Sequence, residues 1–214
     1  MSSCCRPESY GAFFTRRGAE RALRRYRRRG LDKLSARIAK VVKERGVAGS
    51  TVLEVGGGIG ALDVELIQAG AERAINVELS PEYEDAAVAL ASERGVQHRI
   101  ERRVGDFVGE HDIPEADAVV MNRVVCCYPD YEALVGAAAD HARRLLVFTF
   151  PRERALVRGA FRLMNLWLRL TGNDFRGFVH PSSEMLEVGR QHGLTPVLER
   201  QGTFWQLAAL ERAT

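Results

Sequence analysis

The sequence predicts an α/β fold in which helices cover both faces of a mainly parallel sheet. Short apolar segments alternate with helical ones from residue 50 onward, and strands that alternate with helices are typical of parallel sheets. Glycines cluster directly after the first apolar segment, in VLEVGGGIG (52–60). The last two apolar segments are separated only by Gln201-Gly202, so we expect them to form an antiparallel hairpin.

The first two strand–helix units carry clear boundary signals. STVLEV and AINVEL are short apolar runs, each with one acid, and such runs are typical of buried strands. The helices that follow them end at Gly70 and Gly95, and the second begins at Pro81. Proline at the first helical position and glycine just past the last one are common at helix ends.

The later elements continue the same order. HRIERRV alternates charged and apolar residues, which indicates a more exposed third strand. ADAVVMN is the fourth strand, and RRLLVFTF is a fifth strand that Pro151 halts. We therefore expect strands at 50–55, 74–79, 98–104, 116–122, 143–150, 195–200 and 203–210, and helices at 60–70, 81–95, 128–142, 152–170 and 183–192.

The composition is that of a soluble globular protein, with 46% hydrophobic and 28% charged residues. We expect residues 1–214 to form a single domain. The N-terminal MSSCCRPESYGAFF lacks the uninterrupted apolar run of a signal peptide. The sequence has no stretch of roughly 18 apolar residues without a charge, which is the length that a transmembrane helix needs. We therefore expect a cytoplasmic protein with no integral membrane segment.

The glycine cluster after the first strand predicts a ligand site. Glycine inside an element costs roughly 0.5–1 kcal/mol, so Gly56, Gly57, Gly58 and Gly60 indicate a turn that a ligand approaches closely. In open α/β sheets, ligands bind at the carboxyl ends of the strands, against helix N-termini. Because Gly56, Gly58 and Ala61 also fit the dinucleotide pattern G-x-G-x-x-A, the glycines alone leave two ligand classes open.

Three acids near strand ends favour one of these ligands. Glu54 precedes the turn, where a carboxylate would repel a pyrophosphate but suits the ammonium group of an amino acid. Glu78 ends the second strand, where it can accept hydrogen bonds from both ribose hydroxyls. Asp106 follows the third strand and is placed to accept from an adenine amino group, with Phe107 packing on the ring. A nucleoside that carries a cationic amino acid instead of phosphates satisfies all of these positions.

These residues together resemble the class I S-adenosylmethionine-dependent methyltransferases. The resemblance covers about residues 50–210, through E-x-G-x-G-x-G (54–60), VEL, VGDF (104–107) and ADAVVMNRVV. It implies a Rossmann-like fold with a seven-stranded, mostly parallel sheet of order 3-2-1-4-5-7-6, the last strand antiparallel, and helices on both faces. It also implies that residues 50–210 form the core that binds S-adenosylmethionine. Because the methyl group leaves a sulfonium and positive charge is dispersed in the transition state, the chemistry requires no metal in principle.

The resemblance assigns a role to each matching position. Methyl transfer from a sulfonium depends mostly on alignment of donor and acceptor, so most of these residues bind rather than react. The methionine part is expected to lie against Glu54, Gly56, Gly58 and Gly60. The ribose is expected to contact Glu78 and Leu79, and the adenine Asp106 and Phe107. Asn122 is expected at the border between the cofactor and the acceptor.

The segment after the fourth strand bears on the acceptor. NRVVCCYPD (122–130) lacks the Asn/Asp-Pro-Pro-Tyr/Phe motif of enzymes that methylate adenine or glutamine, which leaves other nucleic-acid substrates open. CCYPDYEAL and FRGFVHPSSE are similar to the small-molecule branch that includes magnesium-protoporphyrin O-methyltransferases, except that Cys127 replaces a histidine. We therefore predict a small-molecule acceptor methylated at oxygen, with Tyr128 and His180 as the residues that face it.

Basic residues concentrate at the N-terminus. Residues 1–45 hold 14 Lys and Arg against four acids, and eight of the arginines lie in Arg16–Arg29. We expect residues 1–48 to form an Arg-rich helical extension, which either caps the cofactor pocket or binds an anionic partner or substrate. RNA is one such partner, so the alternative function is an RNA or other nucleic-acid-binding methyltransferase that uses Arg16–Arg29.

Two further features have alternative interpretations. The cysteines form two adjacent pairs, Cys4-Cys5 and Cys126-Cys127, whose spacing matches no zinc pattern, so we expect reduced thiols and no metal site. The helix expected over 152–170 is amphipathic and basic. It either covers the sheet and roofs the acceptor site or rests on a membrane surface.

Overall fold

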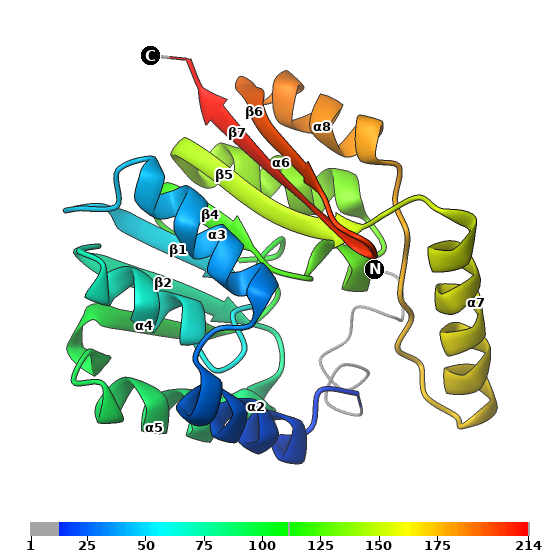
Figure 1. Ribbon diagram of the computed structural model, residues 1–214, viewed down its shortest axis with the longest axis horizontal. Coiled ribbons are helices and arrows are strands. Elements are labelled where there is room, and N and C mark those ends of the chain that lie inside the picture. The colour runs from blue at the N-terminus through cyan, green and yellow to red at the C-terminus, as the bar shows by residue number, and fades with distance from the viewer. Residues whose placement is uncertain (1–12, 111, 214) are drawn as a thin grey trace.

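The computed structural model describes residues 13–110 and 112–213, so the Cys4-Cys5 pair lies outside the described residues. Strands and helices alternate along the chain (Figure 1). The strands are β1 (Thr51–Val55), β2 (Arg73–Glu78), β3 (Ile100–Val104), β4 (Ala116–Met121), β5 (Ala142–Pro151), β6 (Leu194–Gln201) and β7 (Trp205–Arg212). The α-helices are α2 (Arg16–Arg29), α3 (Lys33–Glu44), α4 (Ala61–Gln68), α5 (Glu84–Glu93), α6 (Tyr131–His141), α7 (Ala155–Leu170) and α8 (Ser182–Gln191).

The seven strands form one sheet of order β3-β2-β1-β4-β5-β7-β6. Neighbours among β1 to β5 pair in parallel, whereas β7 pairs antiparallel with both β5 and β6. The predicted α/β class, strand order and closing hairpin are confirmed. Because β2 and β4 flank β1 on opposite sides, the strand order reverses at β1, and the carboxyl end of β1 is where an open α/β sheet binds its ligand.

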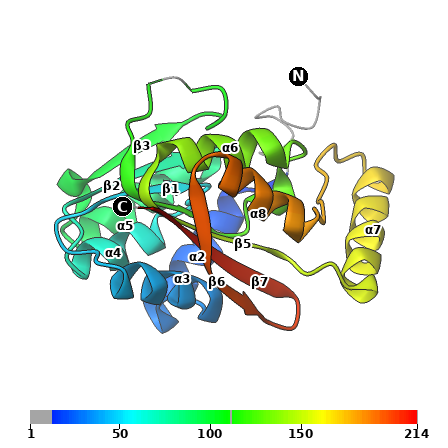
Figure 2. The ribbon, with the colours of Figure 1, turned by 90° about the horizontal axis from the view of Figure 1, so that it is seen from above.

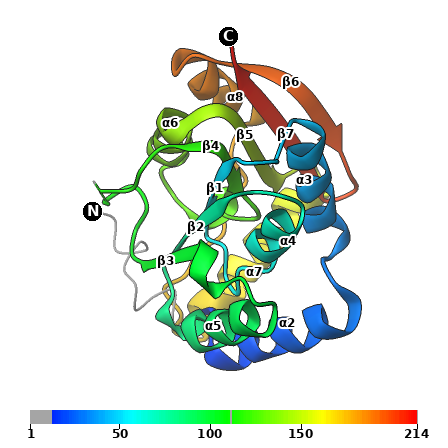
Figure 3. The same cartoon turned by 90° about the vertical axis from the view of Figure 1, so that its left-hand side faces the viewer.

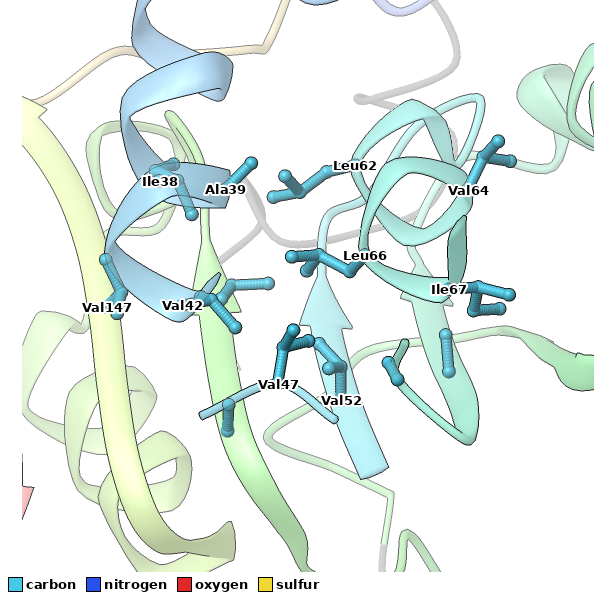
Figure 4. Packing of buried hydrophobic residues seen from close by; sticks show 14 of the residues in the cluster. Ile38, Ala39, Val42, Val47, Val52, Leu62, Val64, Leu66, Ile67 and Val147 are labelled. Atoms are coloured by element: carbon cyan, nitrogen blue, oxygen red, sulfur yellow. The ribbon is translucent and has the colours of Figure 1, made fainter. Parts of the chain in front are cut away.

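One face of the sheet is covered by α3, α4 and α5. In Figure 4, Ile38 and Val42 of α3 and Leu62 and Leu66 of α4 point toward the strands and toward each other. The apolar positions of β1 that face them, such as Val52, alternate with positions that face the opposite side. This packing fixes the start of α4, and therefore the turn between β1 and α4.

The opposite face is covered by α6 and α8, as Figures 2 and 3 show. Leu134 and Ala138 of α6 and Met185 of α8 pack against Leu146 and Phe148 of β5, and all five are buried. Since both faces are covered, most strand residues are apolar, as in other parallel sheets.

The element boundaries lie within a few residues of the prediction, and two of the differences have a clear physical reason. Helix α6 begins at Tyr131 rather than at 128, because the Asp130 side chain caps it and accepts from the Ala133 N–H at 2.9 Å. Strand β5 does not stop before Pro151 but includes it, and Pro151 pairs with Trp205 of β7. These shifts leave the order of elements unchanged.

The basic N-terminal helix α2 packs against the body of the protein through one side. Its N-cap Thr15 accepts from the Gly18 N–H at 3.3 Å, and Leu23 and Tyr26 are buried. The Tyr26 hydroxyl donates to Glu65 of α4 at 2.9 Å. The remaining face of α2 carries the exposed arginines.

Candidate functional site

A cavity of about 240 Å³ opens at the carboxyl ends of the central strands. It lies where the sheet topology places ligands, next to the turn between β1 and α4. Of the residues predicted from the sequence, seven line it: Gly56, Gly58, Glu78, Leu79, Asp106, Phe107 and Asn122. Tyr128 lines it as well.

The turn between β1 and α4 has backbone angles that favour glycine. Gly56, Gly58 and Gly60 have φ values of +64°, +56° and +69°, in the left-handed region that other residues rarely adopt. The Gly56 N–H donates to the Val77 carbonyl at 2.7 Å, which ties the turn to β2. A Cβ atom on Gly56 would lie 2.5 Å from Val124 Cγ2. The turn therefore passes closer to its neighbours than a side chain would allow.

Glu78 is anchored by the backbone at the edge of the cavity. Its Oε2 accepts from the Gly58 N–H at 2.8 Å and its Oε1 from the Ser80 N–H at 2.9 Å. Burial raises the pKa of this carboxyl, although the two N–H groups and the Arg102 guanidinium oppose the rise. A fixed, buried carboxylate of this kind can accept hydrogen bonds from the vicinal hydroxyls of a ribose.

A second carboxylate, that of Asp106, also lines the cavity. Asp106 accepts from the Val108 N–H at 3.2 Å and from the Tyr128 hydroxyl at 3.1 Å. The apolar wall beside it is made by Phe107 and Leu134. An acceptor oxygen next to a flat apolar wall suits a heteroaromatic ring with an amino group. The Tyr128 hydroxyl therefore points to Asp106, on the side predicted to hold adenine.

Glu54 and Gly60, which were predicted to contact the methionine part, do not line the cavity. Glu54 is fully buried behind the turn, where its carboxyl lies against Asp63. Asn76 donates to Asp63 in the same cluster. Gly60 begins α4. We attribute to both residues a role in shaping the turn rather than direct contact with the ligand.

The buried Glu54–Asp63 pair makes stability depend on pH. Burial raises the pKa of Asp63 from 3.8 to about 6 and raises that of Glu54 well above 4.5. Between about pH 4 and 6 the folded protein then holds a proton that the unfolded chain has lost, so the free energy of unfolding falls as the pH rises. Because burial keeps the pKa of Glu54 raised in the variant, we expect Asp63→Asn to make this slope shallower, without abolishing it, in urea titrations across that range. Asp85→Asn, at an exposed carboxylate, should keep the slope, and an equally steep slope in Asp63→Asn would contradict the assignment.

His180 was predicted to face the acceptor, and the structure places it elsewhere. It does not line the cavity, and its Nε2 donates to the Tyr128 carbonyl at 2.9 Å. Its ring lies against the rings of Tyr131 and Phe178. Burial lowers its pKa. These contacts fix the 175–181 loop to the segment before α6, so the geometry favours a positioning role for His180.

A second cavity, of about 320 Å³, adjoins the first and is almost wholly apolar. It shares Phe14, Arg123 and Cys127 with the first cavity. Phe161 stacks near Phe204, with ring centres 6.0 Å apart. The other apolar side chains of the wall are Phe13, Cys126, Ala160, Met164, Phe175 and Trp205.

Arg123 is a residue that the sequence interpretation missed. It has a φ of +62°, unusual for a side chain of this size, and its N–H donates to Thr149 Oγ1 at 2.9 Å. Its guanidinium donates twice to Asp32, at 2.7 and 3.2 Å, and lies 5.7 Å from the centre of the Trp205 ring. Burial of Asp32 acts to raise its pKa, but Arg123 lowers that pKa to about 2. The signal in the sequence that could have identified Arg123 is its position directly after Asn122, at the end of the fourth strand.

Asn122 and the two thiols complete the border between the cavities. Asn122 donates to Ser35 Oγ at 2.9 Å and accepts from Thr149 Oγ1 at 3.0 Å. The sulfur atoms of Cys126 and Cys127 lie 3.7 Å apart. Within residues 13–110 and 112–213, no group of three or more His, Cys, Asp or Glu side chains is arranged to hold a metal ion.

This sheet order, with a glycine turn at the topological switch point and carboxylates at the ends of the next two strands, defines the class I S-adenosylmethionine-dependent methyltransferases. The chain belongs to the methyltransferase domain family, whose model matches residues 23–206. No curated protein sequence matches the chain.

Solved structures share the fold at low sequence identity. Magnesium protoporphyrin IX methyltransferase from Synechocystis, with bound SAH, aligns with a TM-score of 0.74 and 17% identity over 94% of this chain and 97% of that one. An O-methyltransferase family protein from Burkholderia thailandensis gives 0.70 and 20%, over 92% and 60%. A putative RNA methyltransferase from Pyrococcus horikoshii gives 0.58 and 14%, over 84% and 81%.

S-adenosylmethionine is the cofactor, and the residues of the first cavity fit it. Gly58 and Tyr83 both line this cavity, and a side chain at Gly58 would crowd it, since its Cβ atom would lie 3.4 Å from the Tyr83 ring. Glu78 suits the ribose hydroxyls, and Asp106 beside Phe107 suits the adenine. When bound, the cofactor supplies an electrophilic methyl group on a sulfonium.

Proposed function

We propose that this methyltransferase transfers the methyl group to an oxygen atom of a small, apolar molecule. The observation that carries the proposal is the second cavity, whose wall is aromatic and aliphatic and which adjoins the cofactor cavity. Its size suits a small ring system, and pockets of this kind orient a ligand by a few polar groups among apolar ones. A cytoplasmic location stays a prediction from the composition.

The chain's own residues would act mainly by orientation. Holding two reactants in the reactive geometry can contribute roughly 7–11 kcal/mol, and the shared wall of Phe14, Arg123 and Cys127 is where the two ligands would meet. Arg123 is the charged group at this border, and its two bonds to Asp32 hold it in place. A contact of Tyr128 with the acceptor stays a proposal, because its hydroxyl also bonds Asp106.

The proposal predicts that Phe161→Ala weakens acceptor use without weakening cofactor binding. Removing this ring from the apolar wall should raise the acceptor KM about tenfold, the effect of losing roughly 1.4 kcal/mol of apolar contact. The measurement is methyl transfer from labelled cofactor to a panel of aromatic alcohols, with calorimetric titration of S-adenosylhomocysteine beside it. Val88→Ala, on the exposed face of α5, is the matched control. An unchanged acceptor KM in Phe161→Ala would refute the second cavity as the acceptor site.

The alternative proposal is methylation of RNA held by α2. Among the described residues, Arg17, Arg21, Arg28 and Arg29 take part in no ion pair, so they are available to phosphates. A phosphate-based contact requires that RNA affinity fall steeply with salt. Methyl transfer to RNA, lost in Arg28→Ala/Arg29→Ala, would favour this alternative over the small-molecule acceptor.

A further inference from the structure

Helix α7 carries apolar side chains that do not face the protein. Its inner side contributes Val157 and Leu168 to the interior, and Phe161 and Met164 to the wall of the second cavity. Its outer side is also apolar. The exposed fractions there are 84% for Leu156, 68% for Leu163, 53% for Leu166, 61% for Trp167 and 77% for Leu170.

These five residues, the outer stripe, form one continuous surface. At 3.6 residues per turn they fall within an arc of roughly 100° on the helix, opposite the inner side. A second stripe, Arg158, Arg162 and Arg169, runs along one flank of the outer stripe. The helix contains no acidic residue, and only Arg158 has an ion-pair partner among the described residues, Glu153 outside the helix.

Helix α7, which carries the outer stripe, lies away from the sheet. In Figures 1 and 2, α7 stands at one end of the molecule, beyond the carboxyl end of β5. It contacts the body through a small cluster in which Leu168 and Phe175 are buried and Met164 and Phe14 pack against them. Nothing in residues 13–110 and 112–213 covers the outer stripe, since its five side chains stay more than half exposed.

We propose that α7 is an interfacial helix that docks the enzyme on an anionic lipid bilayer. An amphipathic helix that lies in the interface buries Leu and Trp among the acyl chains and places Arg among the headgroups. The arginine stripe beside the outer stripe provides this arrangement and is complementary to anionic headgroups. None of the described helices is long and apolar enough to cross a membrane, so the contact would be peripheral.

A second copy of the chain fits this surface less well. The copy would bring the same helix, which offers no carboxylate to the arginines. Anionic headgroups neutralise them directly. The docking does not depend on the acceptor proposed above, but if that proposal holds, Phe161 and Met164 place the acceptor cavity directly behind the membrane-facing side.

Vesicle binding by the full chain tests the proposal. We expect binding to phosphatidylcholine vesicles that contain phosphatidylglycerol to be at least about tenfold tighter than to pure phosphatidylcholine. In a Trp205→Phe background, which leaves Trp167 as the one tryptophan of the sequence, we expect a blue shift of the fluorescence on binding. Leu163→Ser/Leu170→Ser and Arg162→Glu/Arg169→Glu should each weaken the binding about tenfold or more. Titration with S-adenosylhomocysteine tests whether each variant is folded. The vesicle assay itself requires no methyl acceptor.

The matched control is Arg21→Glu/Arg28→Glu, which changes the net charge equally but on exposed residues of α2. Equal loss of vesicle binding in this control would show non-specific charge attraction and overturn the proposal. So would equal affinity for neutral and anionic vesicles. A dimer in solution that Leu163→Ser/Leu170→Ser converts to a monomer would instead assign the outer stripe to a second copy.

Discussion

Replacing Glu78 with glutamine is expected to weaken S-adenosylhomocysteine binding by about thirtyfold. Both carboxylate oxygens accept from backbone N–H groups, those of Gly58 and Ser80. Glutamine has one acceptor and one donor in their place, so its NH₂ group would face an N–H and release one anchor of the glycine turn. Hydrogen bonds to charged groups contribute about 1.5–3 kcal/mol each, which corresponds to roughly tenfold to a hundredfold in affinity. Calorimetric titration measures the change.

A control and the pH dependence separate this effect from general damage. Glu101→Gln, on β3 and paired with Arg103 at the surface, should leave the affinity unchanged. Because burial raises the pKa of Glu78 above 4.5, binding by the unmodified protein should weaken as the pH is lowered through that raised pKa. Glu78→Gln should lack that dependence. If Glu78→Gln bound S-adenosylhomocysteine as tightly as the unmodified protein, the ribose-binding role of Glu78 would be refuted.

Replacing Gly57 with alanine is expected to reduce the free energy of unfolding by about 3 kcal/mol, at the upper end of the usual range for overpacking. The new Cβ atom would lie 2.0 Å from Asn76 Nδ2 and 2.9 Å from Glu54 Cδ. Both side chains are buried, and Asn76 is hydrogen-bonded to Asp63, so neither can move away without leaving a buried polar group unpaired. Urea denaturation measures the loss.

The matched control is the same substitution at Gly159 of α7. A Cβ atom there meets open space, and alanine is about 1 kcal/mol better than glycine inside a helix. Gly159→Ala should therefore stabilise the protein slightly. A Gly57→Ala variant as stable as the unmodified protein would show that the cluster behind the turn can rearrange, which would contradict the close packing described here.

Features that depend on strand ends could be predicted from the sequence. Glu78 is the last residue of β2 and Asp106 comes two residues after β3, and parallel strands bring their carboxyl ends to one edge of the sheet. The strand order itself came from the resemblance, and the hairpin of β6 and β7 came from the two residues that separate the apolar segments. These features are local in the chain, so short patterns are enough to find them.

Features that depend on side-chain direction could not be predicted in this way. Glu54 precedes the turn as expected, but successive residues of a strand point to opposite faces, and its carboxyl points behind the turn. His180 lies in a loop whose path is set by contacts with Tyr128 and Tyr131. The wall of the second cavity joins residues as distant in the chain as Phe161 and Trp205, and no short pattern links them.

The wall that the two cavities share has a consequence for the order of events in turnover. Phe14, Arg123 and Cys127 border both spaces, and the Phe14 carbonyl is tied to the Ser80 hydroxyl beside Glu78. A molecule in the second cavity would therefore contact the same three side chains that border the cofactor. Occupancy of one cavity is then expected to change the affinity of the other, so donor and acceptor would bind cooperatively rather than independently.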